Sequence, residues 1–248
     1  MRGQAIRAGT GPGTGPVRGS EPTSHRKCTK FGRRHGEHIP SKAMGRRPRK
    51  ELPGGLAHVT CRTIRRLPLF RTEADARAYL ELLDHVTRDV VGWRVLAYCL
   101  MPNHVHLVVD AVVDELSLAM YRVNGLYAQR FNRRHGYRGH LFQGRFHAKP
   151  IVEDAHLPGS VRYVLLNPVR AGLCSRPNHW RWSSCRACAG LEPAHTFLDL
   201  ERVLSFFGAN EAAAQASFSG FLEDGIASGR TGGQAPGLSP ARPSTAPG

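Results

Sequence analysis

The stretch WRVLAYCLMPNHVHLVVDA, residues 93–111, decides the fold because it places two β-forming runs on either side of a tight turn. Residues 93–100 and 104–111 are rich in Val, Leu and aromatic side chains, which favour strands. The intervening Met-Pro-Asn has the proline and asparagine of a tight connection. The stretch therefore predicts a β-hairpin, and alternation along its second strand puts the imidazoles of His104 and His106 on one face of the sheet.

The segments around the hairpin complete a recognisable order of elements. Thr72, with Asp75 three residues later, suits the start of a helix. The whole order is β-α-β-β-α-β followed by a helix, the ferredoxin-like α+β plan of an antiparallel sheet with two helices on one face. Since this plan serves many activities, the function must come from a site. The predicted flanking elements are a strand over 58–64, helices over 73–90 and 116–134, a strand over 145–152 and a helix over 154–167.

The last of these helices carries Tyr163 and has an unusual start. Pro158 and Gly159 lie near its N-terminal end, where unbroken helix formers are expected. They favour, as the alternative to a start at residue 153 or 154, a later start near Ser160, a good N-cap residue. Tyr163 would then lie in the first turn, and Pro168 would end the helix.

The charge of the chain predicts a polyanionic partner, with nucleic acid ahead of an anionic membrane surface. The 248 residues have a formal net charge of +16. Residues 1–50 hold 13 Lys and Arg but only Glu21 and Glu37, in a Gly- and Pro-rich context, which predicts a disordered basic arm. A DNA-binding role for this arm and a merely solvated tail both stay open. We expect a domain over 51–190, a helical extension over 191–227 and a disordered tail over 228–248.

The chain carries no signature of a membrane or secreted protein. No stretch approaches the ~20 apolar residues of a spanning helix, and no apolar region follows the basic residues at the N-terminus. The six cysteines are scattered, so we expect reduced thiols and a cytoplasmic protein. Cys185 and Cys188 form a lone CxxC, which we interpret as packing residues because a zinc site needs a second pair of ligands.

A basic stretch is the best sequence candidate for a DNA-binding surface. Residues 116–152 contain no Asp or Glu but many arginines. The side chains predicted to contact DNA are Arg130, Arg133, Arg134, Arg138, Gln143, Arg145 and Lys149.

Two residue pairs are candidates for chemistry. His104 and His106 on one strand face form a potential pair of metal ligands, although a His-apolar-His pattern alone is weak. Tyr163 and Asn167 are four residues apart and share a helix face. Taken alone, this second pair fits a core tyrosine and an Asn that caps the helix before Pro168 better than it fits a catalytic pair.

In combination, the motifs MPNHVHLVV, GHLFQGRFHAKPIV, RYVLLNPVRAGL and WRWSS resemble the IS200/IS605-like HUH transposases, and specifically the REP-associated tyrosine transposases, over roughly residues 52–190. The resemblance implies that His104 and His106 bind a divalent cation, Mg²⁺ or Mn²⁺, with Asn167 completing the site. It also implies that Tyr163 attacks single-stranded or hairpin DNA and forms a 5′-phosphotyrosine intermediate. Members of the family occur as monomers and as homodimers, so the oligomeric state stays open.

The alternative is a non-catalytic nucleic-acid-binding protein, either a decayed transposase or a ferredoxin-like RNA- or DNA-binding module. The basic charge suits this class equally well. An RNA-recognition module would carry aromatic residues on its strands in a KGFGFVxF-like pattern, which this sequence lacks. Such a protein would also bind nucleic acid without regard to metal or to His104.

Overall fold

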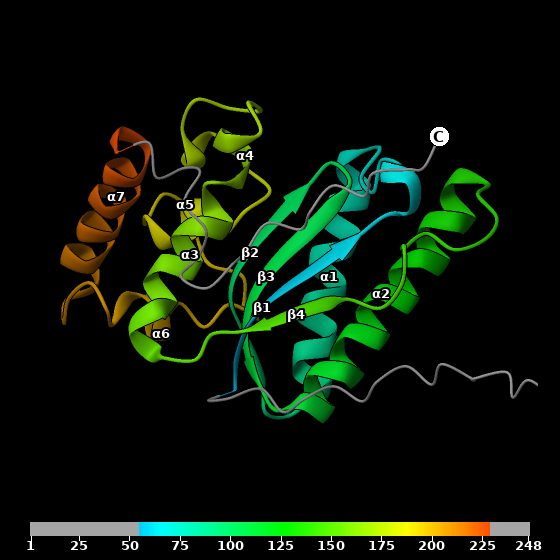
Figure 1. Ribbon diagram of the computed structural model, residues 1–248, viewed down its shortest axis with the longest axis horizontal. Helices are drawn as coiled ribbons and strands as arrows, with labels where there is room; N and C mark the ends of the chain where they lie inside the picture. Colours follow the sequence, from blue (N-terminus) through cyan, green and yellow to red (C-terminus); the bar gives the residue numbers. More distant parts are fainter. Residues whose placement is uncertain (1–54, 229–248) are drawn as a thin grey trace, which may run out of the picture. The chain divides into compact units, whose positions relative to one another are not determined.

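The computed structural model describes residues 55–228, and its centre is a four-stranded antiparallel sheet with the strand order β2-β3-β1-β4 (Figure 1). The predictions for the basic arm over 1–50 and for the tail beyond residue 228 lie outside the described residues. Along the chain the elements follow the expected order β1, α1, β2, β3, α2, β4, α3. The strands are β1 (Leu56–Arg62), β2 (Trp93–Met101), β3 (His104–Ala111) and β4 (His147–Pro150).

The predicted hairpin is confirmed, because β2 and β3 pair antiparallel from Trp93 opposite Ala111 to Met101 opposite His104. β1 then pairs with the free side of β3, which places Thr60 opposite His106. β4 pairs with the other side of β1 and forms an edge of the sheet. Pro150 ends this edge strand, as expected for a residue without a backbone N–H.

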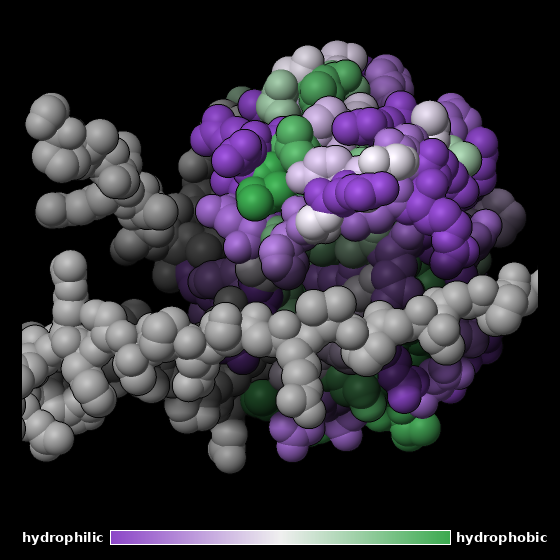
Figure 2. Space-filling model, turned by 90° about the vertical axis from the view of Figure 1, so that its right-hand side faces the viewer, coloured by the Kyte–Doolittle hydropathy of each residue, from purple (hydrophilic) through white to green (hydrophobic). Residues whose placement is uncertain are grey.

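One face of the sheet is covered by α1 (Glu73–Asp89) and α2 (Val113–His135). Alternate strand residues such as Val59 and Leu107 point into this layer and form an apolar core with both helices. The outer surface over α2, at the right of Figure 1, is mainly hydrophilic (Figure 2). This arrangement is the helix-covered face that the sequence predicted.

A buried carboxylate ties the two helices together. Asp75, only 1% exposed, accepts hydrogen bonds from the backbone N–H of Thr72 and from the guanidinium of Arg134, at 2.9 and 2.8 Å. His135 lies 3.0 Å from the same carboxylate. Burial alone raises the pKa of Asp75, but these partners outweigh it and lower the pKa to about 2. The residue that caps α1 thus also anchors the end of α2.

The opposite face carries a second apolar cluster, formed with the C-terminal helices. α3 lies between the sheet and α7 (Figure 1). Helix α7 contacts α3 closely, since Gly225 faces the side chains of Arg162 and Leu166. The helices are α3 (Leu157–Leu165), α4 (Asn167–Arg170), α5 (Cys185–Cys188), α6 (Leu200–Leu204) and α7 (Glu211–Ala227), with short 3₁₀ turns at Ile64–Arg66, Asp154–His156 and Pro177–His179.

The prediction that α3 begins near Ser160 is wrong. The helix begins at Leu157, with Pro158 in its first turn, where a missing backbone N–H breaks no hydrogen bond. A side chain at Gly159 would meet no other atom within 4 Å, so this residue leaves the helix intact. Tyr163 therefore lies in the second turn. Pro168 ends α3 as predicted, although the chain continues directly into α4.

The segment after α4 returns along β2 and anchors the C-terminal part of the chain. The indole N–H of Trp180 donates to the carbonyl of Leu100 at 3.0 Å, and Trp182 packs against the core of the α1 and α2 layer. Cys185 and Cys188 are buried in the opposite apolar cluster, in agreement with a packing role. Within residues 55–228, no helix is long and apolar enough to cross a membrane.

Candidate active site

The face of the sheet opposite α1 and α2 gathers histidines from two strands. His104 and His106 alternate with core residues along β3, and the ring centroids of the two imidazoles are 4.8 Å apart. β1 adds His58 to the same face, with its ring centroid 5.1 Å from that of His106. Strand alternation thus explains why these three imidazoles meet while their neighbours enter the core.

The ring of His104 is held by the turn that precedes it. Its Nδ1 donates to the side-chain oxygen Oδ1 of Asn103 at 2.6 Å. Because Nδ1 carries the proton in this bond, Nε2 is left with its lone pair, the state in which a histidine binds metal. Burial, together with the positive charge of Arg62, lowers the pKa of His104 to about 4 and keeps the ring neutral at pH 7.

The ring of His106 is also held through Nδ1, which lies 2.9 Å from Nε2 of His58. Its other nitrogen, Nε2, is buried and has no hydrogen-bond partner within the described part of the chain. Burial and the nearby cations lower the pKa of His106 well below its usual value. An unpaired buried nitrogen is costly unless a ligand satisfies it, so this atom fits a metal ligand.

Tyr163 projects from α3 toward these histidines. Its ring centroid is 5.5 Å from that of His58 and 6.3 Å from that of His106. The guanidinium of Arg170 lies over the tyrosine ring, 4.3 Å from its centroid. The side chain is half-buried, and the sheet and the helices together place a phenol beside two imidazoles and a guanidinium.

Asn167 behaves first as a helix cap. Its amide nitrogen donates to the backbone carbonyls of Tyr163 and Val164, at 2.9 and 3.3 Å. The residue four positions after Val164 is Pro168, which has no backbone N–H to offer the carbonyl of Val164. These bonds do not use the amide oxygen Oδ1 of Asn167. The capping role that the sequence suggests is therefore present, and the oxygen stays available as a ligand.

Comparison with known proteins identifies the domain that carries this site. Residues 54–165 match the family model described as the IS200-like transposase. Over these residues the chain is similar to the IS200-like transposases. The chain is also similar to a solved structure described as a REP-associated tyrosine transposase bound to a REP hairpin, with a TM-score of 0.49 and 22% identity over 63% of this chain and 94% of that chain. No curated protein matches the chain.

The structure separates the arginines predicted to contact DNA into two groups. Arg130 and Arg134 lie on α2, on the far side of the sheet from His106, and pair with Glu81 and Asp75 of α1. The acid-free stretch of sequence is thus balanced in space by acids of another helix. Arg133 is also on α2, whereas Arg138, Gln143 and Arg145 lie in the loop that leads to β4.

The β4 side of the site offers further polar groups. The backbone N–H of Gln143 donates to the carbonyl of Arg62 at 2.9 Å, which places the loop beside the end of β1. Lys149 of β4 is opposite His58 in register, and its ammonium is buried without a partner among residues 55–228. Sequence reasoning selected Lys149 but missed His58, Arg62 and Arg170, all of which flank the imidazoles.

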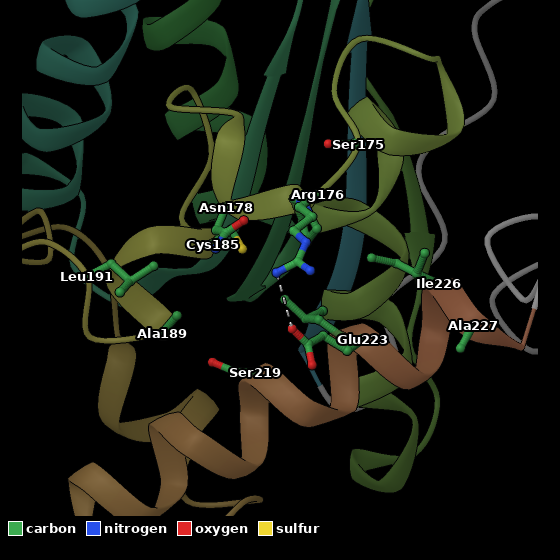
Figure 3. A pocket seen from close by; sticks show the side chains of 12 residues that line it. Ser175, Arg176, Asn178, Cys185, Ala189, Leu191, Ser219, Glu223, Ile226 and Ala227 are labelled. Atoms are coloured by element: carbon green, nitrogen blue, oxygen red, sulfur yellow. Dashed lines mark ion pairs between the residues drawn. The ribbon is translucent and has the colours of Figure 1, made fainter.

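A separate pocket of about 490 Å³ lies between the segment after α4 and α7 (Figure 3). Arg176 and Glu223 form an ion pair across it, and its other walls include Leu191 and Ile226. None of the predicted site residues lines this pocket.

Proposed function

We propose that this protein cuts and rejoins single-stranded DNA at a hairpin, with Tyr163 as the nucleophile. The observation that carries the proposal is the meeting of Tyr163 with His106, whose Nε2 is buried and unpaired. The similarity of residues 54–165 to the IS200-like family supports the choice of DNA strand transfer. The motifs that resemble the REP-associated tyrosine transposases support a hairpin as the form of the DNA.

The residues present fit a small divalent cation. His104 and His106 each have Nδ1 engaged and Nε2 free to bind, and Oδ1 of Asn167, one helical turn after Tyr163, would supply an oxygen ligand. Bound there, Mg²⁺ or Mn²⁺ would polarise the scissile phosphate and help to align it. A mixed nitrogen and oxygen set leaves room for phosphate oxygens and water.

The covalent step then uses the side chain of Tyr163. Its phenolic oxygen attacks phosphorus, and the bond to the 3′ oxygen breaks. The phenol proton passes to solvent, and the departing oxygen takes up a proton to become a 3′-hydroxyl. A 5′-phosphotyrosine remains, and attack on it by a second 3′-hydroxyl rejoins DNA without ATP. Arg170, over the tyrosine ring, would stabilise the negative charge that develops there.

The DNA strand would reach the tyrosine along the edge of the site that carries Arg62. Arg65 and Arg66 follow it in a turn with φ of 51° and 57°, a left-handed conformation that costs non-glycine residues about 1 kcal/mol each. The hydroxyl of Thr63 holds this turn by donating to the carbonyls of Leu67 and Asn103. Both arginines are exposed, and neither forms an ion pair among residues 55–228. We propose that they bind phosphates.

The decisive assay incubates the protein with Mg²⁺ and an end-labelled hairpin oligonucleotide and follows a covalent adduct on a denaturing gel. We expect the adduct with the wild-type chain and none with Tyr163→Phe. Tyr121→Phe is the matched control, because Tyr121 is 78% exposed on α2 and should keep the wild-type yield. Equal yields from Tyr163→Phe and the wild type would refute the assignment. Binding without any adduct, indifferent to Mg²⁺, would favour the non-catalytic alternative.

A further inference from the structure

His58 is buried in the site although it belongs to none of the motifs that indicate the transposase. It lies on β1, 48 residues before His106, and is only 8% exposed. Its Nε2 lies 2.9 Å from Nδ1 of His106, and its ring presents an edge contact to Tyr163 with the centroids 5.5 Å apart. A polar residue buried at this position needs a role that the two ligand histidines do not provide.

The geometry between the two rings is that of a hydrogen bond. The ring planes are inclined by only 19°, and the centroids are 5.1 Å apart. The distance between the ring centroids is longer than the distance between the two nitrogens by about twice the distance from an imidazole centroid to its own nitrogen. The two nitrogens therefore lie on the line between the rings and point directly at each other. Two ligands of one ion would instead direct their lone pairs at a common third point. His58 is therefore placed as a partner of His106.

This hydrogen bond decides which nitrogen of His106 is free. When Nδ1 donates its proton to Nε2 of His58, the lone pair of His106 stays on Nε2, the buried atom without a partner in the described part of the chain. Asn103 acts on His104 in the same way through Nδ1. Thr60 is the other group near Nδ1 of His106, but its hydroxyl is 3.4 Å away and is the weaker partner.

We propose that His58 is a positioning residue that fixes the metal-binding tautomer and the ring orientation of His106. The proposal rests on the proposed function, in which His104 and His106 hold a divalent cation. Outer-shell partners of ligand histidines commonly change metal affinity by 10- to 100-fold when they are removed. Because the same ring contacts Tyr163, His58 also holds the side chain of Tyr163 and the ring of His106 in a fixed relative position.

The test measures Mn²⁺ binding to the full chain, without DNA, by isothermal titration calorimetry. We expect His58→Phe, which keeps a ring but cannot accept a hydrogen bond, to weaken Mn²⁺ binding by about 10- to 100-fold. His58→Gln can place an amide oxygen near the former Nε2 and should restore binding to within about threefold. His85→Phe is the matched control, because His85 is an exposed histidine on α1, on the other face of the sheet, and should bind as the wild type does.

Two results would overturn the proposal. One is Mn²⁺ binding by His58→Phe that equals the wild type. The other is an equal loss in His58→Phe and His58→Gln in proteins with unchanged circular dichroism and thermal unfolding, which would indicate packing of the ring and not its hydrogen bond. Failure of the proposed metal site looks different. In that case the wild type and a His104→Ala, His106→Ala double variant would bind Mn²⁺ alike, whatever residue occupies position 58.

Discussion

The two faces of the sheet are made by alternating residues of the same strands, yet they treat polar groups differently. On the face under α1 and α2, the polar groups buried deepest in the core have partners. The hydroxyl of Tyr79 donates to Asn124 at 3.1 Å, and that of Tyr127 donates to the carbonyl of Leu69 at 2.6 Å. Asp75 has an equally complete set of partners. This face is organised for stability, because every satisfied buried group avoids a desolvation penalty.

The opposite face leaves polar groups unsatisfied. Among the buried side-chain atoms that lack a partner in the described part of the chain, two nitrogens, Nε2 of His106 and Nζ of Lys149, belong to this face, whereas those on α2 are oxygens, of Glu115 and Asn132. Three imidazoles and the ring of Tyr163 lie around them. Such atoms cost folding free energy until a ligand binds. From this difference we expect substitutions on the face under α1 and α2 to change stability, and substitutions on the opposite face to change the chemistry.

The largest expected effect comes from a substitution of His106, on the face of the sheet that carries the three imidazoles. His106→Ala should lower the rate of covalent adduct formation by about 10³-fold or more, because under the proposed function it removes a metal ligand and with it about 4 kcal/mol of transition-state stabilisation. Initial rates on denaturing gels would measure this. His85→Ala should keep the wild-type rate, since that side chain is exposed on α1, on the other face of the sheet. A His106→Ala rate within tenfold of the wild type would contradict the proposal that the chemistry takes place on this face.

The next effect concerns stability and its dependence on pH. The pKa of Asp75 in the folded protein is about 2, below the ~3.9 of an unfolded chain. Its contribution is therefore present above pH ~4 and is lost as the pH falls toward 2. Asp75→Asn should cost about 2–3 kcal/mol at pH 7 and should flatten this acid-induced loss.

Urea unfolding at pH 7 and pH 3 would measure both parts of this prediction. Glu73→Gln is the control, because Glu73 forms only exposed ion pairs with Arg77 and Arg181, worth less than about 0.5 kcal/mol. The adduct yield per folded molecule should not change in either variant. A loss of chemistry in Asp75→Asn with normal stability would contradict the separation of the two faces.

A smaller effect should arise behind the tyrosine helix. A methyl group at Gly225 of α7 would approach the side chain of Arg162 to 2.8 Å and that of Leu166 to 3.0 Å. Gly225→Ala should therefore destabilise the protein by about 1–2 kcal/mol through overpacking. Gly220→Ala, on the same helix with no atom within 4 Å, should stabilise it by about 0.5–1 kcal/mol. Changes of opposite sign in the thermal unfolding temperature of the two variants would confirm that α7 packs closely against α3, and changes of the same sign would contradict it.

The smallest expected effect distinguishes the arginines of the two faces. Arg66→Ala should weaken the binding of single-stranded DNA by about 1 kcal/mol and reduce the salt slope by about 0.7, as for one lost phosphate contact. Arg130→Ala should change neither quantity, because Arg130 pairs with Glu81 on the helical side. Fluorescence anisotropy over a salt series would measure both. A larger loss of DNA affinity from Arg130→Ala than from Arg66→Ala would indicate that α2 belongs to the DNA-binding surface.

Sequence patterns predict the hairpin, the order of elements and the placement of His104 and His106, because these features depend on local alternation. They miss His58, which meets His106 only through the pairing of β1 with β3. The signal is available in principle, since His58, Thr60 and Arg62 alternate along the predicted first strand. Without the strand order, however, nothing assigns that face to the site.

One prediction that the structure contradicts and one that it leaves untested both depend on context that the sequence does not show. The pair Pro158 and Gly159 suggests an interrupted helix, but a proline in the first turn needs no hydrogen-bond donor. The arginines of α2 suggest a DNA-binding surface because no acid lies near them in sequence. Acids of α1 approach Arg134 and Arg130 only after α1 packs on α2. Context in three dimensions decides both cases.

The most direct test of the proposed function is to identify the residue that carries the DNA. The wild-type adduct would be digested with protease and nuclease, and the modified peptide would be sequenced by mass spectrometry. We predict a phosphonucleotide on Tyr163, beside His58 and His106. Modification of Tyr121 on the surface of α2, or of any other tyrosine, would contradict it.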